Sequence, residues 1–323
     1  MHEMVDGAAR LLKENPVLRP LVLLRRRLIS RRSSRKREII DRMISLHGQS
    51  ASDSIYSLLG SGEPCFVGRF GSCELGIVAE FARRRGKMDI DSNALVWTMA
   101  EKGGFYPVTL DSVRRFAELN VDLMENIDIL GSWCPEEADF RKRLKAASKV
   151  PLKDLEPYMN DSPWTRALSG KKVLVINPLV ATIRTQYLKR KTLFKSADML
   201  PEFELLLYKP VYEFDRSERA YDSWFDALEK MERDIASIRF DVAIIGCGPF
   251  GMPLADRVKK LGRQAIVLGG ATQILFGIKG GRWDRDPFFQ GLYNDHWVYP
   301  SREETPIGAM TLEQGCYWKP AGQ

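Results

Sequence analysis

The chain has 323 residues, 44% of them hydrophobic, and a formal net charge of +7 at pH 7. This length and composition allow a large core in one or two domains. No stretch approaches the roughly 18 apolar residues of a membrane-spanning helix, and no signal peptide is legible at the N-terminus. Five scattered cysteines without a C-x-x-C pair indicate neither a zinc site nor a disulfide framework. We therefore expect a protein of the reducing cytoplasm.

The positive charge is concentrated at one end of the chain. Residues 1–40 carry 11 Lys or Arg against 4 Asp or Glu, so the remaining body is neutral. A nucleic-acid enzyme spreads basic surface over its body, so we expect no nucleic-acid partner. Leucine and valine between residues 17 and 29 favour peripheral attachment to an anionic membrane at its inner face. A solvated helical arm or an oligomer contact explains the same pattern equally well. We divide the chain into a basic helical arm, residues 1–45, and one domain, residues 46–323.

Beyond the arm, apolar runs alternate with segments of helical periodicity. The helices are expected at Glu38–His47, Glu74–Arg85, 112–127, Ala181–Lys191, Ala220–Ser237 and between the last two strands. The strands are expected at Cys65–Phe70, Ile127–Gly131, Lys172–Ile176, Glu204–Tyr208, Val242–Ile245 and Ala265–Leu268. This alternation predicts an α/β fold with a mostly parallel sheet and helices on both of its faces.

The last strand–helix–strand unit contains a glycine-rich loop. Bare main-chain N–H groups at the start of a helix suit phosphate oxygens. The spacing fits a dinucleotide fingerprint, but no carboxylate follows the second strand, where it would hold a ribose. The loop therefore indicates a phosphate or nucleotide site of another kind, an NAD(P) site, or only a tight turn. The glycines in question are Gly246, Gly248 and Gly251 in the loop, and Gly269 and Gly270 after the second strand.

Polar or charged residues also follow the carboxyl ends of other predicted strands. Ligands of such sheets lie outside the carboxyl ends of the strands. Arg69 after the first strand is suited to clamp a diphosphate, and Glu74 to hold a metal ion or a sugar hydroxyl. A local ion pair between these two residues is the alternative. The further candidates at strand ends are Gly71, Ser72, Asn177, Thr272 and Gln273.

Several ordered segments resemble one known family. The stretch PCFVGRFGSCELGIV resembles the R-[FY]-G-D-G-E segment of GT-D-type bacterial glycosyltransferases. VLVINPLVATIRTQY, AIIGCGPFG, LGGATQILFGIKGGRW and NDHWVYP…EQGCYW are similar to further segments of that group, so the resemblance spans about residues 60 to 318. It implies a Rossmann-like single domain. It also implies transfer of a sugar from a nucleotide-diphosphate donor to a cell-surface glycan, a lipid-linked acceptor or a protein-linked acceptor.

The chain departs from the family at one position. The family's Asp-x-Glu metal motif falls on Ser72 and Glu74, and a hydroxyl is a poor ligand for Mn²⁺ or Mg²⁺. We therefore expect Glu74 to be the one carboxylate ligand of a weak site and Arg69 to neutralise much of the phosphate charge. A catalytically silent nucleotide- or glycan-binding protein remains an alternative, as does an NAD(P)-dependent oxidoreductase.

A few residues are candidates for the catalytic base of the transfer and for further contacts with the donor. An inverting transfer needs a base for the acceptor hydroxyl, and Glu74, Asp295 and His296 are the candidates. Lys279 and Arg282 follow the glycine-rich region, where they would clamp phosphate or stay solvated. Trp283 and Trp297 would stack on a base or sugar, or else pack in the core.

Overall fold

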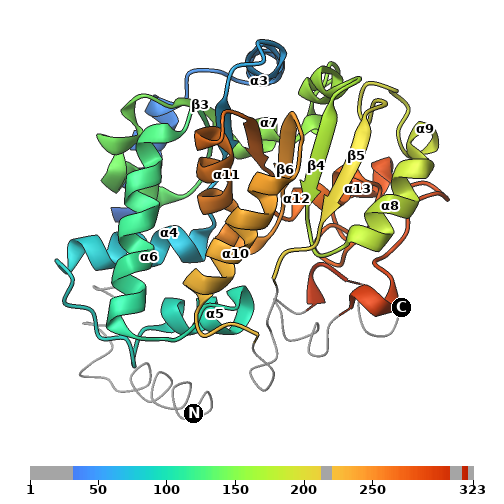
Figure 1. Cartoon of the computed structure of the whole chain (residues 1–323). Helices are drawn as coiled ribbons and strands as arrows, with labels where there is room; N and C mark the ends of the chain where they lie inside the picture. The colour runs from blue at the N-terminus through green and yellow to red at the C-terminus, as the bar shows by residue number, and fades with distance from the viewer. Residues whose placement is uncertain (1–31, 212–219, 306–314, 319–323) are drawn as a thin grey trace, which may run out of the picture.

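A computed structural model describes residues 32–211, 220–305 and 315–318. Within these residues one sheet of seven strands crosses the molecule in the order β3-β2-β1-β7-β6-β4-β5, and every strand pair is parallel (Figure 1). The predicted α/β fold with a parallel sheet is therefore confirmed. The strands are β1 (Cys65–Gly68), β2 (Ile129–Ser132), β3 (Ser148–Pro151), β4 (Lys172–Ile176), β5 (Glu204–Tyr208), β6 (Val242–Ile245) and β7 (Gln264–Val267).

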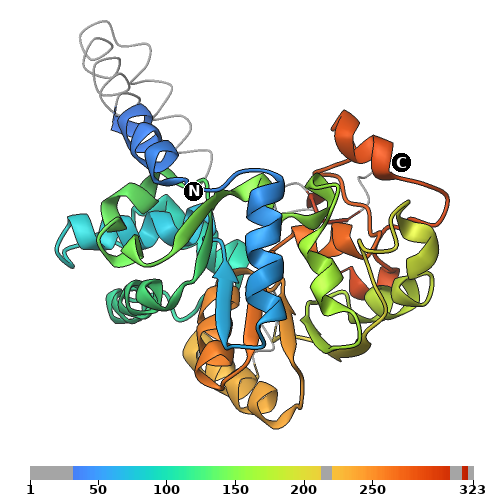
Figure 2. The same cartoon turned by 90° about the horizontal axis from the view of Figure 1, so that it is seen from above.

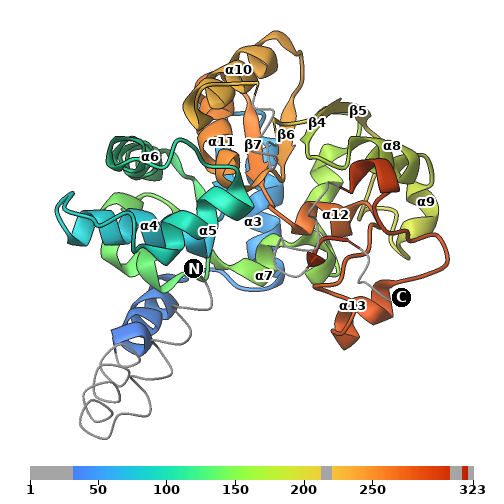
Figure 3. The ribbon, with the colours of Figure 1, turned by 90° about the horizontal axis from the view of Figure 1, so that it is seen from below.

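Both faces of the sheet are covered, which explains the continuous apolar runs of its strands. Successive side chains of a strand point to opposite faces. Phe66 of β1 accordingly packs into one core and its neighbour Val67 into another. Helices α10 (Trp224–Ser237) and α11 (Gly251–Lys260) lie on the first face, whereas α3 (Gln49–Gly60) lies on the opposite face (Figure 3).

Several helices begin directly after a residue whose side chain caps them. Asn93 accepts hydrogen bonds from the N–H groups of Leu95 and Val96, and Ser223 accepts one from Asp226. The remaining α-helices are α4 (Ser72–Arg83), α5 (Ala94–Gly103), α6 (Leu110–Asp122), α7 (Leu152–Leu155), α8 (Val180–Leu188), α9 (Arg190–Leu193), α12 (Ala271–Leu275) and α13 (Pro287–Leu292).

Three strands were predicted with their observed bounds, whereas several helix bounds were wrong. The helix predicted over residues 112–127 ends as α6 at Asp122 and continues as a 3-10 turn, Leu123–Asn126. The helix predicted over Ala181–Lys191 is interrupted at Lys189, between α8 and α9. The helix predicted from Ala220 begins at Trp224, because Ser223 caps it.

Six of these elements were missed altogether. They are β3, α3, α5, α7, α12 and α13. The strand β3 reads Ser-Lys-Val-Pro, which has too few apolar residues to stand out as a buried strand. It lies at the edge of the sheet, where fewer apolar residues are needed.

The basic arm is described only at its end. Residues 1–31 lie outside the described residues, so the predicted membrane contact stays a prediction. Residues 32–43 are helical and extend away from the body of the molecule (Figure 2). Ile40 of this helix is buried, and Lys36 Nζ lies 2.6 Å from Asp139 Oδ2. Among the described helices, none combines the length and apolar character needed to cross a membrane.

Candidate functional site

A pocket of about 350 Å³ opens at the carboxyl ends of the strands. Its position follows from the topology. Strands β4 and β6 are neighbours, but the chain leaves β4 toward β5 at the edge of the sheet and leaves β6 toward β7 at its centre. Such a divergence opens a crevice between the loops, and α/β proteins bind ligands there. Asn177 after β4 and Gly246 after β6 both line the pocket.

The floor of the pocket is a close approach of main chains at Gly246. A Cβ atom at this position would lie 2.6 Å from both the Gly269 carbonyl oxygen and Thr272 Oγ1, and 2.8 Å from Asn177 Nδ2. Asn177 Nδ2 also donates to the Gly246 carbonyl oxygen at 3.1 Å. Glycine is therefore required here by space, since three segments meet at one point.

We expect Gly246→Ala to lower the free energy of unfolding by about 1–3 kcal/mol, the usual cost of inserting a methyl group into a filled site. Urea-induced unfolding measures this change. Gly60→Ala is the matched control, because no heavy atom lies within 4 Å of its Cβ position and it ends a helix, where alanine is favoured. Equal stability of the two variants would contradict the close approach at Gly246.

The glycine-rich loop serves packing as much as binding. Gly251 begins α11, and its Cβ would lie 3.1 Å from Val267 Cγ1, so this glycine allows close helix–strand contact rather than lining the pocket. Gly248 has φ +58° and requires the freedom of glycine. Pro249 follows without an N–H group, so the loop offers fewer phosphate donors than its glycine count suggests. No carboxylate occupies the end of β7, where Leu268 leads into Gly269 and Gly270.

Three cationic side chains reach the pocket from separate parts of the chain. Arg69 follows β1, Lys209 follows β5 and Arg282 comes from the C-terminal segment. The sequence analysis did not identify Lys209. Its position directly after the strand Glu204–Tyr208 could have indicated it, because residues that follow parallel strands lie at the edge of the sheet where the pocket opens. Convergence of three positive charges favours an anionic ligand.

The contacts of the Arg69 guanidinium leave some of its N–H donors unused among the described residues. Its guanidinium lies against Gly269, where Cζ would be 3.2 Å from an added Cβ, and 5.6 Å from the centre of the Trp133 ring. One terminal nitrogen donates to the Phe70 carbonyl oxygen at 3.4 Å. Nε is buried, and within the described residues no atom accepts a hydrogen bond from it. These contacts differ from the ion pair with Glu74 that the sequence also allowed.

Glu74 lies at the start of α4, where its negative charge is favoured by the helix dipole. A Cβ on Gly71 would collide with the Glu74 carboxylate, so the carboxylate lies directly over the main chain of Gly71. Both residues and Ser72 line the pocket.

The residues present do not assemble a strong divalent-metal site. The described part of the chain contains no cluster of three or more His, Cys, Asp or Glu side chains suited to a metal ion. Besides Glu74, the carboxylates that line the pocket among the described residues are Glu303 and Glu304, and Glu304 is already engaged by α8, as described next. Because Mn²⁺ and Mg²⁺ prefer several carboxylate or carbonyl oxygens, this donor set fits a tightly held ion poorly.

Glu304 holds the N-terminus of α8. Its Oε1 accepts from Ala181 N at 2.6 Å and its Oε2 from Thr182 N at 2.9 Å, and the Thr182 hydroxyl donates to the same Oε2. These N–H groups have no partner within the helix. The Glu304 carboxylate thus occupies the position at the N-terminus of α8 where an external anion could otherwise bind.

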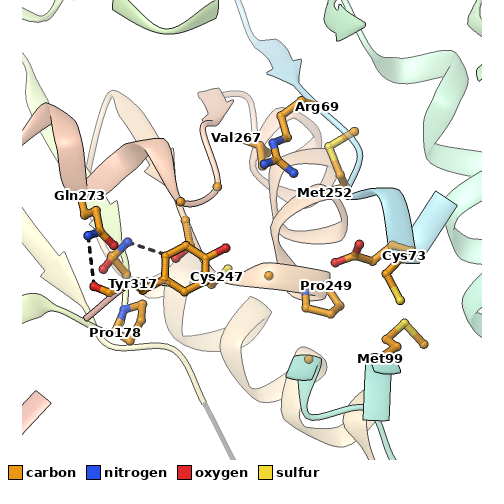
Figure 4. Close-up of a pocket in the computed structure, with 18 of the residues that line it drawn as sticks. Arg69, Cys73, Met99, Pro178, Cys247, Pro249, Met252, Val267, Gln273 and Tyr317 are labelled. Atoms are coloured by element: carbon orange, nitrogen blue, oxygen red, sulfur yellow. Dashed lines mark hydrogen bonds between the residues drawn. The ribbon is translucent and has the colours of Figure 1, made fainter. Parts of the chain in front are cut away.

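The C-terminal segment forms one wall of the pocket. The Tyr317 ring lies over Gly270, whose Cβ would be 2.6 Å from Tyr317 Cε1, and Arg282 Cζ lies 4.9 Å from the centre of this ring. Gln273 Nε2 donates to the carbonyl oxygens of Lys279 at 2.9 Å and Tyr317 at 3.3 Å. Figure 4 shows Gln273 and Tyr317 at one end of the pocket and Cys73 and Met99 at the other.

The structure gathers most of the predicted site residues around this pocket. Eleven of them line it: Arg69, Gly71, Ser72, Glu74, Asn177, Gly246, Gly248, Gly269, Gly270, Gln273 and Arg282. Thr272 is fully buried beneath it, and Gly251 packs against Val267. Unpredicted lining residues include Trp133, Lys209, Glu303, Glu304 and Tyr317.

Three further predicted residues do not line the pocket. Asp295 and His296 are exposed, and the His296 carbonyl oxygen accepts from Gln186 Nε2 at 2.9 Å. Lys279 Nζ lies over the Tyr293 ring at 5.2 Å. The two tryptophans singled out in the sequence, Trp283 and Trp297, are buried in the core, as their packing alternative predicts.

We expect iodoacetamide at pH 8 to label Cys73 before the other cysteines. Cys73 is partly exposed in the pocket, whereas the other four are buried. Burial raises the pKa of the Cys65 thiol to about 12 and raises those of Cys134 and Cys247 still further, so their thiolate fraction at pH 8 is negligible. Peptide mass mapping reads the order of labelling. A bound nucleotide diphosphate should slow the labelling of Cys73, and unchanged labelling would place the ligand elsewhere.

No family model, no curated protein and no solved structure matches this chain. The function of the site therefore rests on its own geometry and chemistry.

Proposed function

We propose that this protein is a glycosyltransferase that binds a nucleotide-diphosphate sugar in the pocket at the carboxyl ends of β1, β4, β6 and β7. The observation that carries the proposal is the convergence of Arg69, Lys209 and Arg282 on one pocket with a glycine-lined floor. Bare main chain admits phosphate groups closely, and the cations balance their charge. The resemblance of PCFVGRFGSCELGIV to GT-D-type enzymes supports the same function.

The pocket supplies what a glycosyl transfer needs. The bond between the sugar and the diphosphate breaks more easily when the departing negative charge is stabilised. Arg69 lines the pocket, where it is placed to bind that charge, and Lys209 and Arg282 add to the positive potential. Of the three predicted bases, Glu74 is the one that lines the pocket, so we assign it to the acceptor hydroxyl.

The acceptor and the location of the enzyme remain part of the proposal. A cell-surface glycan, a lipid-linked acceptor or a protein-linked acceptor would approach the open side of the pocket. A cytoplasmic enzyme attached to the inner face of a membrane through residues 1–40 would meet a lipid-linked acceptor there.

A thermal-shift panel tests the proposal. UDP, GDP and their sugar conjugates, NAD and NADP are each added with and without Mn²⁺. A ligand at 100 times its dissociation constant stabilises the fold by about 2.7 kcal/mol, so we expect a clear shift with one nucleotide diphosphate and none with NAD. Release of the nucleotide from its sugar conjugate then separates an enzyme from a silent binder. A shift with NAD or NADP and none with UDP or GDP would overturn the proposal in favour of an oxidoreductase.

A further inference from the structure

Trp133 stands out among the tryptophans of this chain. It directly follows β2 and lines the pocket, and 40% of its surface is exposed. Trp283 and Trp297 are 7% and 4% exposed. An exposed indole at a pocket wall leaves a large apolar surface in water, and such a surface gains free energy when a ligand covers it.

The indole ring is held firmly in place. Its Nε1 donates to the Phe70 carbonyl oxygen at 2.9 Å. The main-chain N of Trp133 donates to Glu137 Oε1 at 3.0 Å, as does that of Cys134 at 2.9 Å, and Glu137 is itself 1% exposed. A ligand that stacks on this ring therefore does not have to immobilise it, which removes one entropic cost of binding.

The neighbour of the ring indicates which part of a ligand would reach it. The Arg69 guanidinium lies over the indole ring, with its Cζ 5.6 Å from the ring centre. In a nucleotide sugar, the donor sugar is bonded directly to the terminal phosphate, whereas the base is separated from the phosphates by the ribose. A ring beside the phosphate-binding arginine thus matches the sugar rather than the base.

We propose that Trp133 is the stacking platform for the sugar ring of the donor, a role that rests on the proposed function. One face of a pyranose presents C–H groups that pack on an aromatic ring through dispersion and burial of apolar surface. Trp133 thereby distinguishes the nucleotide sugar from the nucleotide diphosphate alone. The sugar is also placed so that its bond to the phosphate lies beside Arg69.

The test compares two ligands that differ only in the sugar. Dissociation constants of UDP and UDP-glucose, UDP and UDP-N-acetylglucosamine, and GDP and GDP-mannose are measured by titration calorimetry for the wild-type protein, Trp133→Ala, Trp133→Leu and Trp133→Phe. For the pair that the wild type binds, we expect Ala and Leu to weaken the sugar conjugate about tenfold and the free nucleotide less than about twofold. Phe should retain most of the affinity for the sugar conjugate, because it preserves an aromatic face. If the alanine variant does not fold, the comparison of Trp133→Leu with Trp133→Phe still shows whether an aromatic face is needed to bind the sugar conjugate.

The outcomes separate this inference from the proposed function. Suppose that the wild type binds a conjugate. If the Leu variant then loses the same affinity for the conjugate as for the free nucleotide, or loses affinity for neither, Trp133 is not the sugar platform. The proposed function stands in both cases. If the wild type binds none of the five ligands, the proposed function falls, and this inference falls with it.

Discussion

Arg69→Ala is expected to weaken binding of the nucleotide diphosphate by about 100-fold while leaving the melting temperature nearly unchanged. Two charge-assisted hydrogen bonds to phosphate contribute about 3 kcal/mol, and each 1.4 kcal/mol is a factor of ten. We expect the fold to lose little, because among the described residues the guanidinium makes one long hydrogen bond, at 3.4 Å to Phe70, and a ring contact at 5.6 Å to Trp133. Titration calorimetry and differential scanning calorimetry measure the two effects.

Two variants serve as controls for Arg69. Arg69→Lys keeps the charge but loses the planar fork of donors, so we expect an intermediate loss of affinity. Arg143→Ala removes a half-exposed arginine whose partner is Glu125, away from the pocket, and should leave binding unchanged. Unaltered nucleotide affinity in Arg69→Ala, or a large fall in melting temperature, would show that Arg69 is structural.

Glu304→Ala is expected to lower the free energy of unfolding by about 2–3 kcal/mol. The substitution leaves the N–H groups of Ala181 and Thr182 and the Thr182 hydroxyl without their acceptor, and it removes a negative charge from the start of α8. Urea-induced unfolding measures the loss. Glu303→Ala is the matched control. Glu303 is exposed and does not accept from the N–H groups at the start of α8, so its substitution should change stability little.

The same variant reports on the anion preference of this helix. Once the Glu304 carboxylate is gone, its place at the N-terminus of α8 suits an inorganic anion. Sulfate should therefore raise the melting temperature of Glu304→Ala more than that of the wild type or of Glu303→Ala. An equal response of all three proteins would show that the carboxylate serves packing alone.

The sequence by itself determined the class of fold and the segments that form its site. Runs such as Val173–Ile176 and Val242–Ile245 are apolar at every position, because both faces of a parallel sheet are buried, and this signal is local. The glycine loop is local as well. Gly248 and Gly251 meet their backbone and packing requirements within one strand–helix–strand unit, whereas Gly246 is also required by its contact with Asn177 after β4.

Only the tertiary structure decided which side chains share the pocket. Trp133, Lys209 and Glu304 are far apart in the chain. Trp133 and Lys209 become site residues because parallel strands bring their carboxyl ends to one edge of the sheet, whereas Glu304 is placed there by its hydrogen bonds to the start of α8. The exposed fraction of the side chain distinguishes Trp133 from Trp283, a difference that the sequence alone does not show. The same physics placed Asp295 and His296 on the surface, since the loop that carries them packs its Trp297 into the core and turns its polar residues to water.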